Sequence, residues 1–116
     1  MVNFEDLKGK TLTNIEQDDD RILIFTCKDG SKYKMYHEQD CCEDVKIEDI
    51  TGELNDLLNS EIMVAEERTN KNSLSDGGSQ TWTFYTLRTQ KAPVDIRWCG
   101  ESNGYYSESV DFISID

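Results

Sequence analysis

The most hydrophobic run in the sequence spans residues 21–27, Arg-Ile-Leu-Ile-Phe-Thr-Cys, and it constrains the fold more than any other stretch. Apolar side chains fall on both faces of this run, which predicts a central strand covered on each side. Residues 28–31, Lys-Asp-Gly-Ser, favour a tight hairpin because Asp-Gly readily adopts the positive φ angles that such a turn requires. Residues 32–37 then return as the partner strand, with side chains alternating between the two faces. We therefore expect a sheet built around this hairpin.

The rest of the chain predicts further strands and little helix. Residues 3–8 indicate one short N-terminal helical turn capped by Asn3. Residues 49–58 place apolar side chains at helical spacing and predict one helix, although Gly52 weakens it. Four later stretches predict strands, 62–69, 81–88, 94–99 and 105–115; apolar and polar residues alternate in 94–99, and 81–88 has high β propensity. This pattern predicts an α+β domain with a mainly antiparallel sheet of about six to seven strands.

The chain of 116 residues is expected to form a single domain over 1–116. Residues 70–80 carry neither a strand nor a helix pattern and predict a flexible loop. No apolar run reaches the roughly 20 residues that a membrane span needs, and the first residues lack the layout of a signal peptide. We therefore expect a cytoplasmic protein that does not bind membranes, with its four cysteines as thiols.

Acidic residues dominate the middle of the chain, and the formal net charge is −12. Between residues 37 and 67 the only basic residue is Lys46, so one strongly acidic face is expected. A negative field of this kind repels nucleic acid and favours a partner protein with a basic surface. Direct nucleic-acid binding is therefore not expected.

Residues 36–44, Tyr-His-Glu-Gln-Asp-Cys-Cys-Glu-Asp, hold the only histidine, two adjacent cysteines and four carboxylates. His37, Cys41 and Cys42 are possible zinc or iron ligands, but adjacent cysteines point apart and no Cys-x-x-Cys pair supports them. A His37–Cys41 nucleophile is also disfavoured, because neighbouring carboxylates raise the pKa of a thiol. We expect a binding site here, with no metal, cofactor or catalytic residue. A metal- or thiol-dependent enzyme using these side chains is the weaker alternative.

A second candidate surface lies at residues 97–108, which are rich in aromatic rings and hydroxyls. Aromatic rings supply rigid apolar area, serine and asparagine supply adaptable hydrogen bonds, and Arg97 can hold an anion through two hydrogen bonds. The mixture suits a small polar ligand or a protein loop, and an ordinary polar hairpin end is the structural alternative. An alternative function is the sequestering of a nucleotide-like signal in a pocket lined by His37, Arg97, Tyr105 and Tyr106.

Three blocks of the sequence carry a resemblance to known proteins. They are residues 36–45 continued by Ile-Glu-Asp-Ile at 47–50, Thr-Trp-Thr-Phe-Tyr at 81–85, and Ser-Asn-Gly-Tyr-Tyr-Ser-Glu-Ser-Val at 102–110. Together they resemble a family of small proteins from tailed phages and prophages, described as a domain of unknown function. The resemblance spans nearly the whole chain and implies a phage-encoded, intracellular protein. It brings no established activity, so no catalytic residue is carried over.

The leading hypothesis is a small acidic binding protein that acts on the host of a phage, as a host-protein inhibitor, a host-takeover factor or an anti-defence factor. Its partner is expected to be a host protein with a basic surface, or else a small polar ligand. Binding to a basic partner predicts salt-sensitive association, lost on charge reversal. The residues predicted to contact the partner or ligand are His37, Asp40, Cys41, Cys42, Glu43, Asp44, Glu48, Asp49, Arg97, Asn103, Tyr105, Tyr106 and Glu108.

Overall fold

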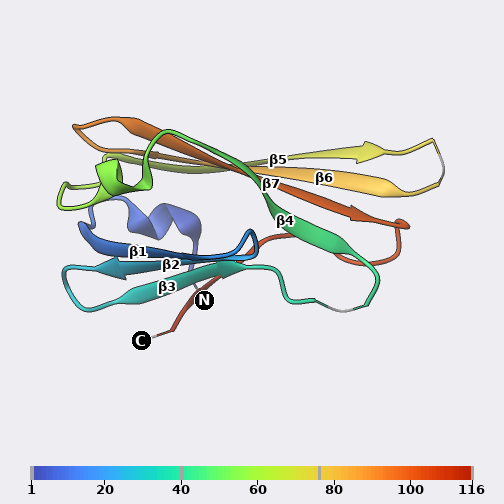
Figure 1. The fold of residues 1–116 in the computed structure, drawn as a ribbon, viewed down its shortest axis with the longest axis horizontal. Coiled ribbons are helices and arrows are strands. Elements are labelled where there is room, and N and C mark those ends of the chain that lie inside the picture. Colours follow the sequence, from blue (N-terminus) through green and yellow to red (C-terminus); the bar gives the residue numbers. More distant parts are fainter. Residues whose placement is uncertain (1, 40, 76, 116) are drawn as a thin grey trace.

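The computed structural model describes residues 2–39, 41–75 and 77–115, which form two antiparallel sheets of four strands each. The first sheet has the order β1-β2-β3-β8, with β1 (Leu12–Asp18), β2 (Ile22–Cys27), β3 (Lys32–Tyr36) and β8 (Asp111–Ser114). The second sheet has the order β4-β7-β6-β5, with β4 (Asp44–Thr51), β7 (Pro93–Ser102), β6 (Ser79–Arg88) and β5 (Val64–Ser73). Figure 1 shows the sheets stacked as two layers, with the second sheet reaching farther to the right.

The expected α+β class is wrong, because the chain is nearly all β. The helical segments of the described residues are two 3-10 turns, η1 (Phe4–Leu7) and η2 (Leu54–Leu57). The turn predicted at 3–8 is therefore present as η1, whereas the helix predicted near 49–58 does not form. Within the described ranges, none of the helical segments has the length and apolar character needed to cross a membrane.

Gly52 explains why no helix forms near 49–58. Its φ of 98° is outside the right-handed helical region, so the chain turns at this residue after β4 has ended at Thr51. Ile50 lies in β4 opposite Ile96 of β7. Leu57 is buried in the short turn η2. The apolar residues whose spacing suggested one helix are thus divided between a strand and a 3-10 turn, and tertiary pairing overrides the local pattern.

The hairpin predicted from residues 21–37 is confirmed. Strand β2 lies between β1 and β3, and Gly30 in the β2–β3 turn has a φ of 93°. The Asp29 side chain accepts a hydrogen bond from the backbone N–H of Ser31 at 3.0 Å, which fixes the turn. One detail differs from the expectation: alternate residues of β2 are fully buried, while those between them are only half-buried. The strand is therefore central in its sheet but fully covered on one face only.

Strand pairing also shortens the loop expected at 70–80. Residues 64–73 of β5 pair with residues 79–88 of β6, with Ser73 opposite Ser79. Most of the expected loop is therefore a continuation of the hairpin, and its turn begins at Leu74, whose backbone N–H donates to the carbonyl oxygen of Gly78 at 2.8 Å. The closing strand expected at 105–115 is in turn limited to β8.

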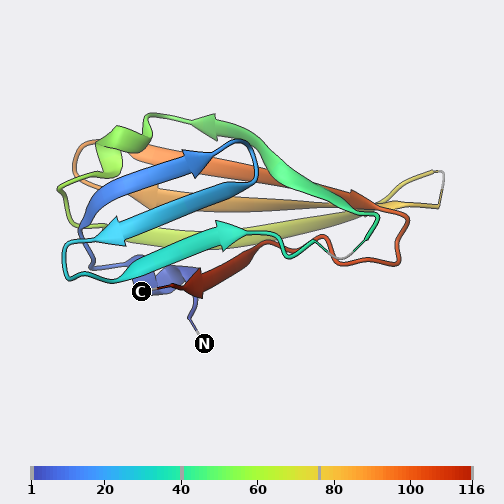
Figure 2. The ribbon, with the colours of Figure 1, turned by 60° about the horizontal axis from the view of Figure 1, so that its bottom comes forward.

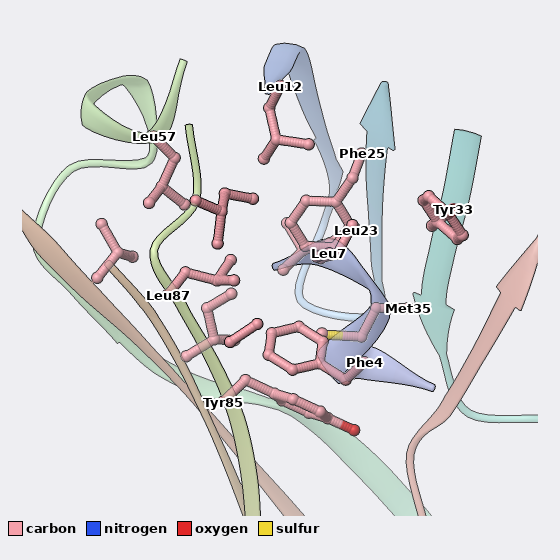
Figure 3. Packing of buried hydrophobic residues seen from close by; sticks show 14 of the residues in the cluster. Phe4, Leu7, Leu12, Leu23, Phe25, Tyr33, Met35, Leu57, Tyr85 and Leu87 are labelled. Carbon is pink, nitrogen blue, oxygen red and sulfur yellow. The ribbon is translucent and has the colours of Figure 1, made fainter. Parts of the chain in front are cut away.

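The core fills the space between the two sheets and is closed by the short turn η1. Phe4 and Leu7 of η1 insert between the layers (Figure 3). The ring of Phe4 lies 4.6 Å from that of Tyr85 in the second sheet and 5.5 Å from that of Phe112 in the first, measured between centroids. Trp98, fully buried in β7, donates its indole N–H to the Met35 sulfur of β3 at 3.2 Å. Aromatic side chains thus pack between the two layers, and the polar segments that connect the sheets lie at one end of the sandwich.

Candidate functional site

Two segments carry the chain between the sheets, 37–43 from β3 to β4 and 103–110 from β7 to β8. Strand β3 pairs with β8, with Tyr36 opposite Asp111, and β4 pairs with β7. The two segments therefore lie side by side, and Figures 1 and 2 place both at the end from which the β5–β6 hairpin projects. We call them the paired crossovers. They bring together the two sequence blocks that the sequence alone predicted as separate candidate surfaces.

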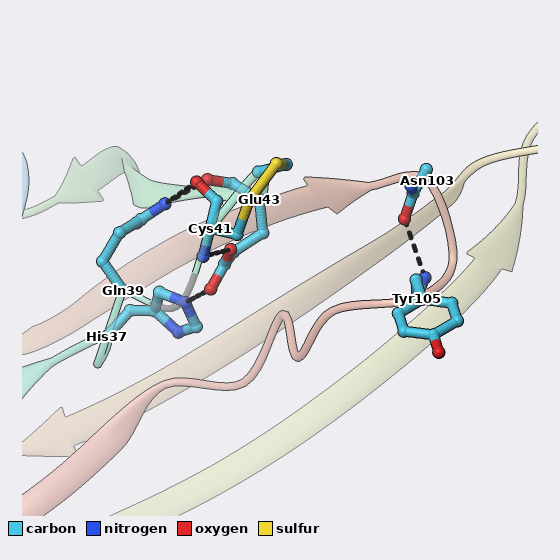
Figure 4. The surroundings of a disulfide bond; sticks show 7 residues. His37, Gln39, Cys41, Glu43, Asn103 and Tyr105 are labelled. Atoms are coloured by element: carbon cyan, nitrogen blue, oxygen red, sulfur yellow. Dashed lines mark hydrogen bonds and ion pairs between the residues drawn. A yellow bond between two sulfur atoms is a disulfide. The ribbon is translucent and has the colours of Figure 1, made fainter.

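The imidazole of His37 holds the paired crossovers together. Its Nδ1 lies 2.7 Å from the carbonyl oxygen of Ser109. Its Nε2 lies 2.8 Å from Oε2 of Glu43, and Figure 4 shows this second contact. The side chain of His37 is 4% exposed and that of Glu43 is 0% exposed. The atoms that face the two ring nitrogens are a carbonyl oxygen and a carboxyl oxygen, both of which can accept hydrogen bonds. The contact is therefore a buried clasp between the two crossovers.

Glu43 also closes the first crossover on itself. Its Oε1 accepts a hydrogen bond from the backbone N–H of Cys41 at 2.9 Å, and its carbonyl oxygen accepts one from Nε2 of Gln39 at 2.6 Å (Figure 4). Asp40, another predicted contact residue, lies outside the described residues. Because the Glu43 carboxylate is buried and bonded within the chain, reversing its charge would disturb folding before it tested any docking surface.

Cys41 and Cys42 are joined to each other by a disulfide, and both residues are exposed. The expectation of four thiols is therefore wrong for this pair and holds for Cys27 and Cys99. That expectation rested on the reducing conditions of a cytoplasm, whereas these neighbours are bonded with their Cα atoms 3.7 Å apart.

No activated thiol or metal cluster is found in the described parts of the chain. Burial, together with the carboxylate of Glu101, raises the pKa of the Cys99 thiol, which opposes formation of a nucleophilic thiolate. Within residues 2–39, 41–75 and 77–115, no group of three or more His, Cys, Asp and Glu side chains is placed to hold a metal ion. Both nitrogens of His37 already contact groups within the chain, the Ser109 carbonyl oxygen and the Glu43 carboxyl.

Glu108 anchors the second crossover and is itself only 6% exposed. Its carboxylate accepts hydrogen bonds from the hydroxyls of Ser79, Ser102 and Thr81, the last at 2.7 Å. Burial alone would raise the pKa of the Glu108 carboxyl, but these three donors outweigh burial and lower it. A Cβ atom on Gly100 would lie 2.8 Å from the Glu108 carbonyl oxygen, so glycine is needed for this close approach.

Between these anchors the second crossover presents an exposed aromatic tip. The backbone N–H of Tyr105 donates to Oδ1 of Asn103 at 3.0 Å, and that of Gly104 donates to the Ser102 hydroxyl at the same distance. Tyr105 is 85% exposed, and its ring packs edge-on against that of half-buried Tyr106, with centroids 5.7 Å apart. The tip is thus held by local hydrogen bonds while one large ring faces solvent (Figure 4).

Three predicted acidic contact residues lie exposed on β4 but form ion pairs within the chain. Asp44 pairs with Arg21 at 2.9 Å. Glu48 pairs with Arg97 at 2.5 Å, and Asp49 approaches the same guanidinium at 3.7 Å. The acidic surface is therefore partly neutralised by its own arginines. Reversing these charges would break internal pairs as well as remove negative charge.

The four residues proposed to line a nucleotide pocket are spread over different surfaces. His37 borders a hollow of about 410 Å³ with Arg21 and Gln39. Arg97 stacks over Trp82, with its guanidinium carbon 5.6 Å from the ring centroid. Tyr106 lines another hollow beside Glu108, and Tyr105 projects from the exposed tip.

Several polar residues of the site were missed by sequence reasoning. Ser79 was placed in a flexible loop, and Thr81 was counted only as part of a strand of high β propensity. One signal was available: Thr81 and Thr83 lie on the same face of the strand as Tyr85, opposite to Trp82, where a purely apolar core would place apolar side chains. Ser109 gave no local signal of its contact with His37, because the two residues are 72 positions apart in the sequence.

Residues 5–112 match the model of a family described as a domain of unknown function, DUF7448. The match covers almost the whole chain. Neither a curated protein nor a solved structure matches the sequence. The family description assigns no activity, so the geometry of the paired crossovers is the guide to function.

Proposed function

We propose that this chain, which belongs to the DUF7448 family of domains of unknown function, acts by binding a partner protein with a basic surface and not by catalysis. The observation that supports this most directly is the exposed tip of the second crossover. Tyr105 is 85% exposed there, although the chain on either side of it is fixed by hydrogen bonds. An exposed aromatic ring on a fixed backbone is typical of a residue that dominates a protein interface.

The tip is held at both ends by hydrogen bonds. On one side the Ser102 hydroxyl donates to the carboxylate of Glu108, and on the other the Ser109 carbonyl oxygen faces the His37 ring. A segment fixed in this way loses little conformational entropy on binding, which favours affinity. In this proposal His37, Glu43 and Glu108 are supporting residues, and the exposed Tyr105 ring and the Asn103 amide make the contact.

The charge of the chain supports a basic partner. The formal net charge is −12, and the exposed carboxylates of Glu101, on the strand that leads into the tip, and of Asp44, opposite it on β4, lie close to the tip. Complementary charge raises the rate of association and makes it sensitive to salt. Pairing of Asp44 with Arg21 reduces the field only locally. A basic protein surface is therefore the partner chemistry that this end of the molecule favours.

The biological setting that we propose is the cytoplasm of a bacterial host, where a phage-encoded protein of this kind inhibits a host protein or counters a defence system. The support is the resemblance of three sequence blocks to small phage and prophage proteins. Two of these blocks form the paired crossovers, so the residues that carry the resemblance are also those that shape the exposed tip.

The test uses the whole protein as bait in a bacterial lysate, with wild type compared with Tyr105→Ser. Met63→Ser is the matched control, because Met63 is also an exposed apolar residue but precedes the opposite end of β5. We expect a basic protein that wild type and Met63→Ser capture and that Tyr105→Ser loses. With the purified partner, the loss should be about 2 kcal/mol, roughly thirtyfold in affinity.

Salt provides an independent check on the same pair of proteins. Affinity should fall steadily with ionic strength, because long-range attraction between opposite charges is screened. Capture that is unchanged by Tyr105→Ser, or affinity that does not depend on salt, would contradict the proposed interface.

A further inference from the structure

A second polar site lies on the inner face of the second sheet, beyond the region that the first sheet covers. Here the second crossover runs beneath the ends of β5 and β6, as Figure 1 shows. The hollow between them has a volume of about 260 Å³. Strand residues Thr69, Thr81 and Thr83 line it from the sheet, and Tyr106 and Glu108 line it from the crossover. We call it the threonine pocket.

Thr83 gives the first indication that this pocket receives a ligand. The residue is 1% exposed, and its hydroxyl oxygen has no hydrogen-bond partner within the described parts of the chain. Buried hydroxyls are nearly always hydrogen-bonded, because leaving one without a partner costs the free energy of its lost hydration. The hydroxyl of Thr83 is therefore placed to bond a group that enters the pocket.

Two carboxylates give the pocket further capacity to accept hydrogen bonds. Oε1 of Glu108 accepts one hydrogen bond from Thr81, while Oε2 accepts those from Ser79 and Ser102. Glu67, also in the lining, accepts the hydroxyl of Tyr85 on Oε2 at 2.9 Å. Since a carboxylate offers about four lone-pair positions, both groups can accept from a further donor.

The lining also limits the charge of the ligand. Lys71 is the one basic residue among the side chains around the pocket, and it is set against the carboxylates of Glu67 and Glu108. The chain as a whole carries a charge of −12, so phosphate and other anions are repelled. The volume corresponds to about nine water molecules at roughly 30 Å³ each, which suits a single small ring.

We propose that the threonine pocket binds a neutral polyhydroxylated molecule of monosaccharide size. Ligand hydroxyls would donate to Glu67 and Glu108 and exchange hydrogen bonds with the threonine hydroxyls, including that of Thr83. The half-buried ring of Tyr106 supplies an apolar surface for the carbon face of a sugar ring. This site is separate from the exposed Tyr105 tip, and it does not depend on the protein partner.

The test is a titration of the ¹⁵N-labelled whole protein with D-glucose, D-ribose and N-acetyl-D-glucosamine at millimolar concentration, followed by amide chemical shifts. At least one sugar should give saturable shifts at residues 67–71, 81–83 and 106–110. Thr83→Val keeps the shape of the side chain and removes its hydroxyl, so it should weaken binding about tenfold. Thr86→Val is the matched control, because Thr86 lies on the opposite face of β6 and bonds Asp95 at 2.7 Å.

Each outcome decides for or against the pocket. Saturable shifts at these residues that Thr83→Val weakens and Thr86→Val leaves unchanged would support it. The absence of saturable shifts with all three sugars would overturn it and leave water as the occupant, and so would shifts that both variants leave unchanged. Tighter binding of D-ribose 5-phosphate than of D-ribose would also overturn the assignment to a neutral ligand.

Discussion

Replacing Glu43 with alanine should destabilise the protein strongly, although no ligand or partner is involved. The substitution removes the acceptor of two short contacts, one from Nε2 of His37 at 2.8 Å and one from the Cys41 N–H at 2.9 Å. The His37 side chain is 4% exposed, so water cannot easily replace the lost carboxylate. Each buried polar group left without its partner costs about 1–3 kcal/mol, so the two lost contacts together cost about 2–6 kcal/mol. We expect Glu43→Ala to lose stability in this range.

Glu43→Gln should be much milder, because an amide can serve both contacts. Its oxygen can accept from the Cys41 N–H, and its N–H can donate to Nε2 of a neutral His37 ring whose Nδ1 still donates to Ser109. The loss is then the difference between charge-assisted and neutral hydrogen bonds, about 1–2 kcal/mol. The comparison of the two variants separates the need for hydrogen bonding from the need for charge.

Urea unfolding followed by fluorescence measures both variants. With a slope of about 2 kcal/mol per molar urea, a loss of about 4 kcal/mol moves the midpoint by roughly 2 M. Glu53→Ala is the control, because Glu53 is exposed, makes no side-chain capping bond and should change stability by less than about 0.5 kcal/mol. A Glu43→Ala midpoint within the error of wild type, or a Glu43→Gln loss as large as that of Glu43→Ala, would refute the clasp.

Three further predictions concern the second crossover and the core. The pKa of Glu108 is lower in the folded protein than its ordinary value of 4.5, so the ionised carboxylate stabilises the fold above that pH. This stability is lost as the pH falls through the folded pKa. Stability should therefore fall more steeply with acid in wild type than in Glu108→Gln. Gly100→Ala should lower the free energy of unfolding by about 1–3 kcal/mol, since its Cβ would lie 2.8 Å from the Glu108 carbonyl oxygen; an unchanged melting temperature would contradict this close packing. Trp98→Ala should cost about 3–5 kcal/mol in urea unfolding, and clearly more than Trp82→Ala on the half-buried face of β6.

Local sequence patterns were reliable where the partner residue is close in the chain. The Asp29-Gly30 turn and the alternation of apolar and polar residues in β7 follow from neighbouring residues, and the structure confirms them. The helix predicted near 49–58 does not form, because Ile50 pairs with β7 as part of a strand and the chain turns at Gly52, whose φ is positive. Spacing alone could not show which of these two uses of the same apolar residues would prevail.

The roles of the site residues were decided by tertiary structure. His37 and Glu43 were predicted to face a partner, but the contact with Ser109 that buries the ring joins residues 72 positions apart. Glu108 was likewise expected at a surface, and it is instead bonded to hydroxyls of β6 and β7.

The sequence by itself determined the acidic charge, the strand pattern and the two polar blocks from which the site is made, because each depends on residue type and short-range geometry. Only the tertiary structure decided that these blocks become neighbours, because that depends on β3 pairing with β8 while β4 pairs with β7. That order of strands places both crossovers at one end. It thereby selects which carboxylates are buried as supports and leaves the Tyr105 ring facing solvent.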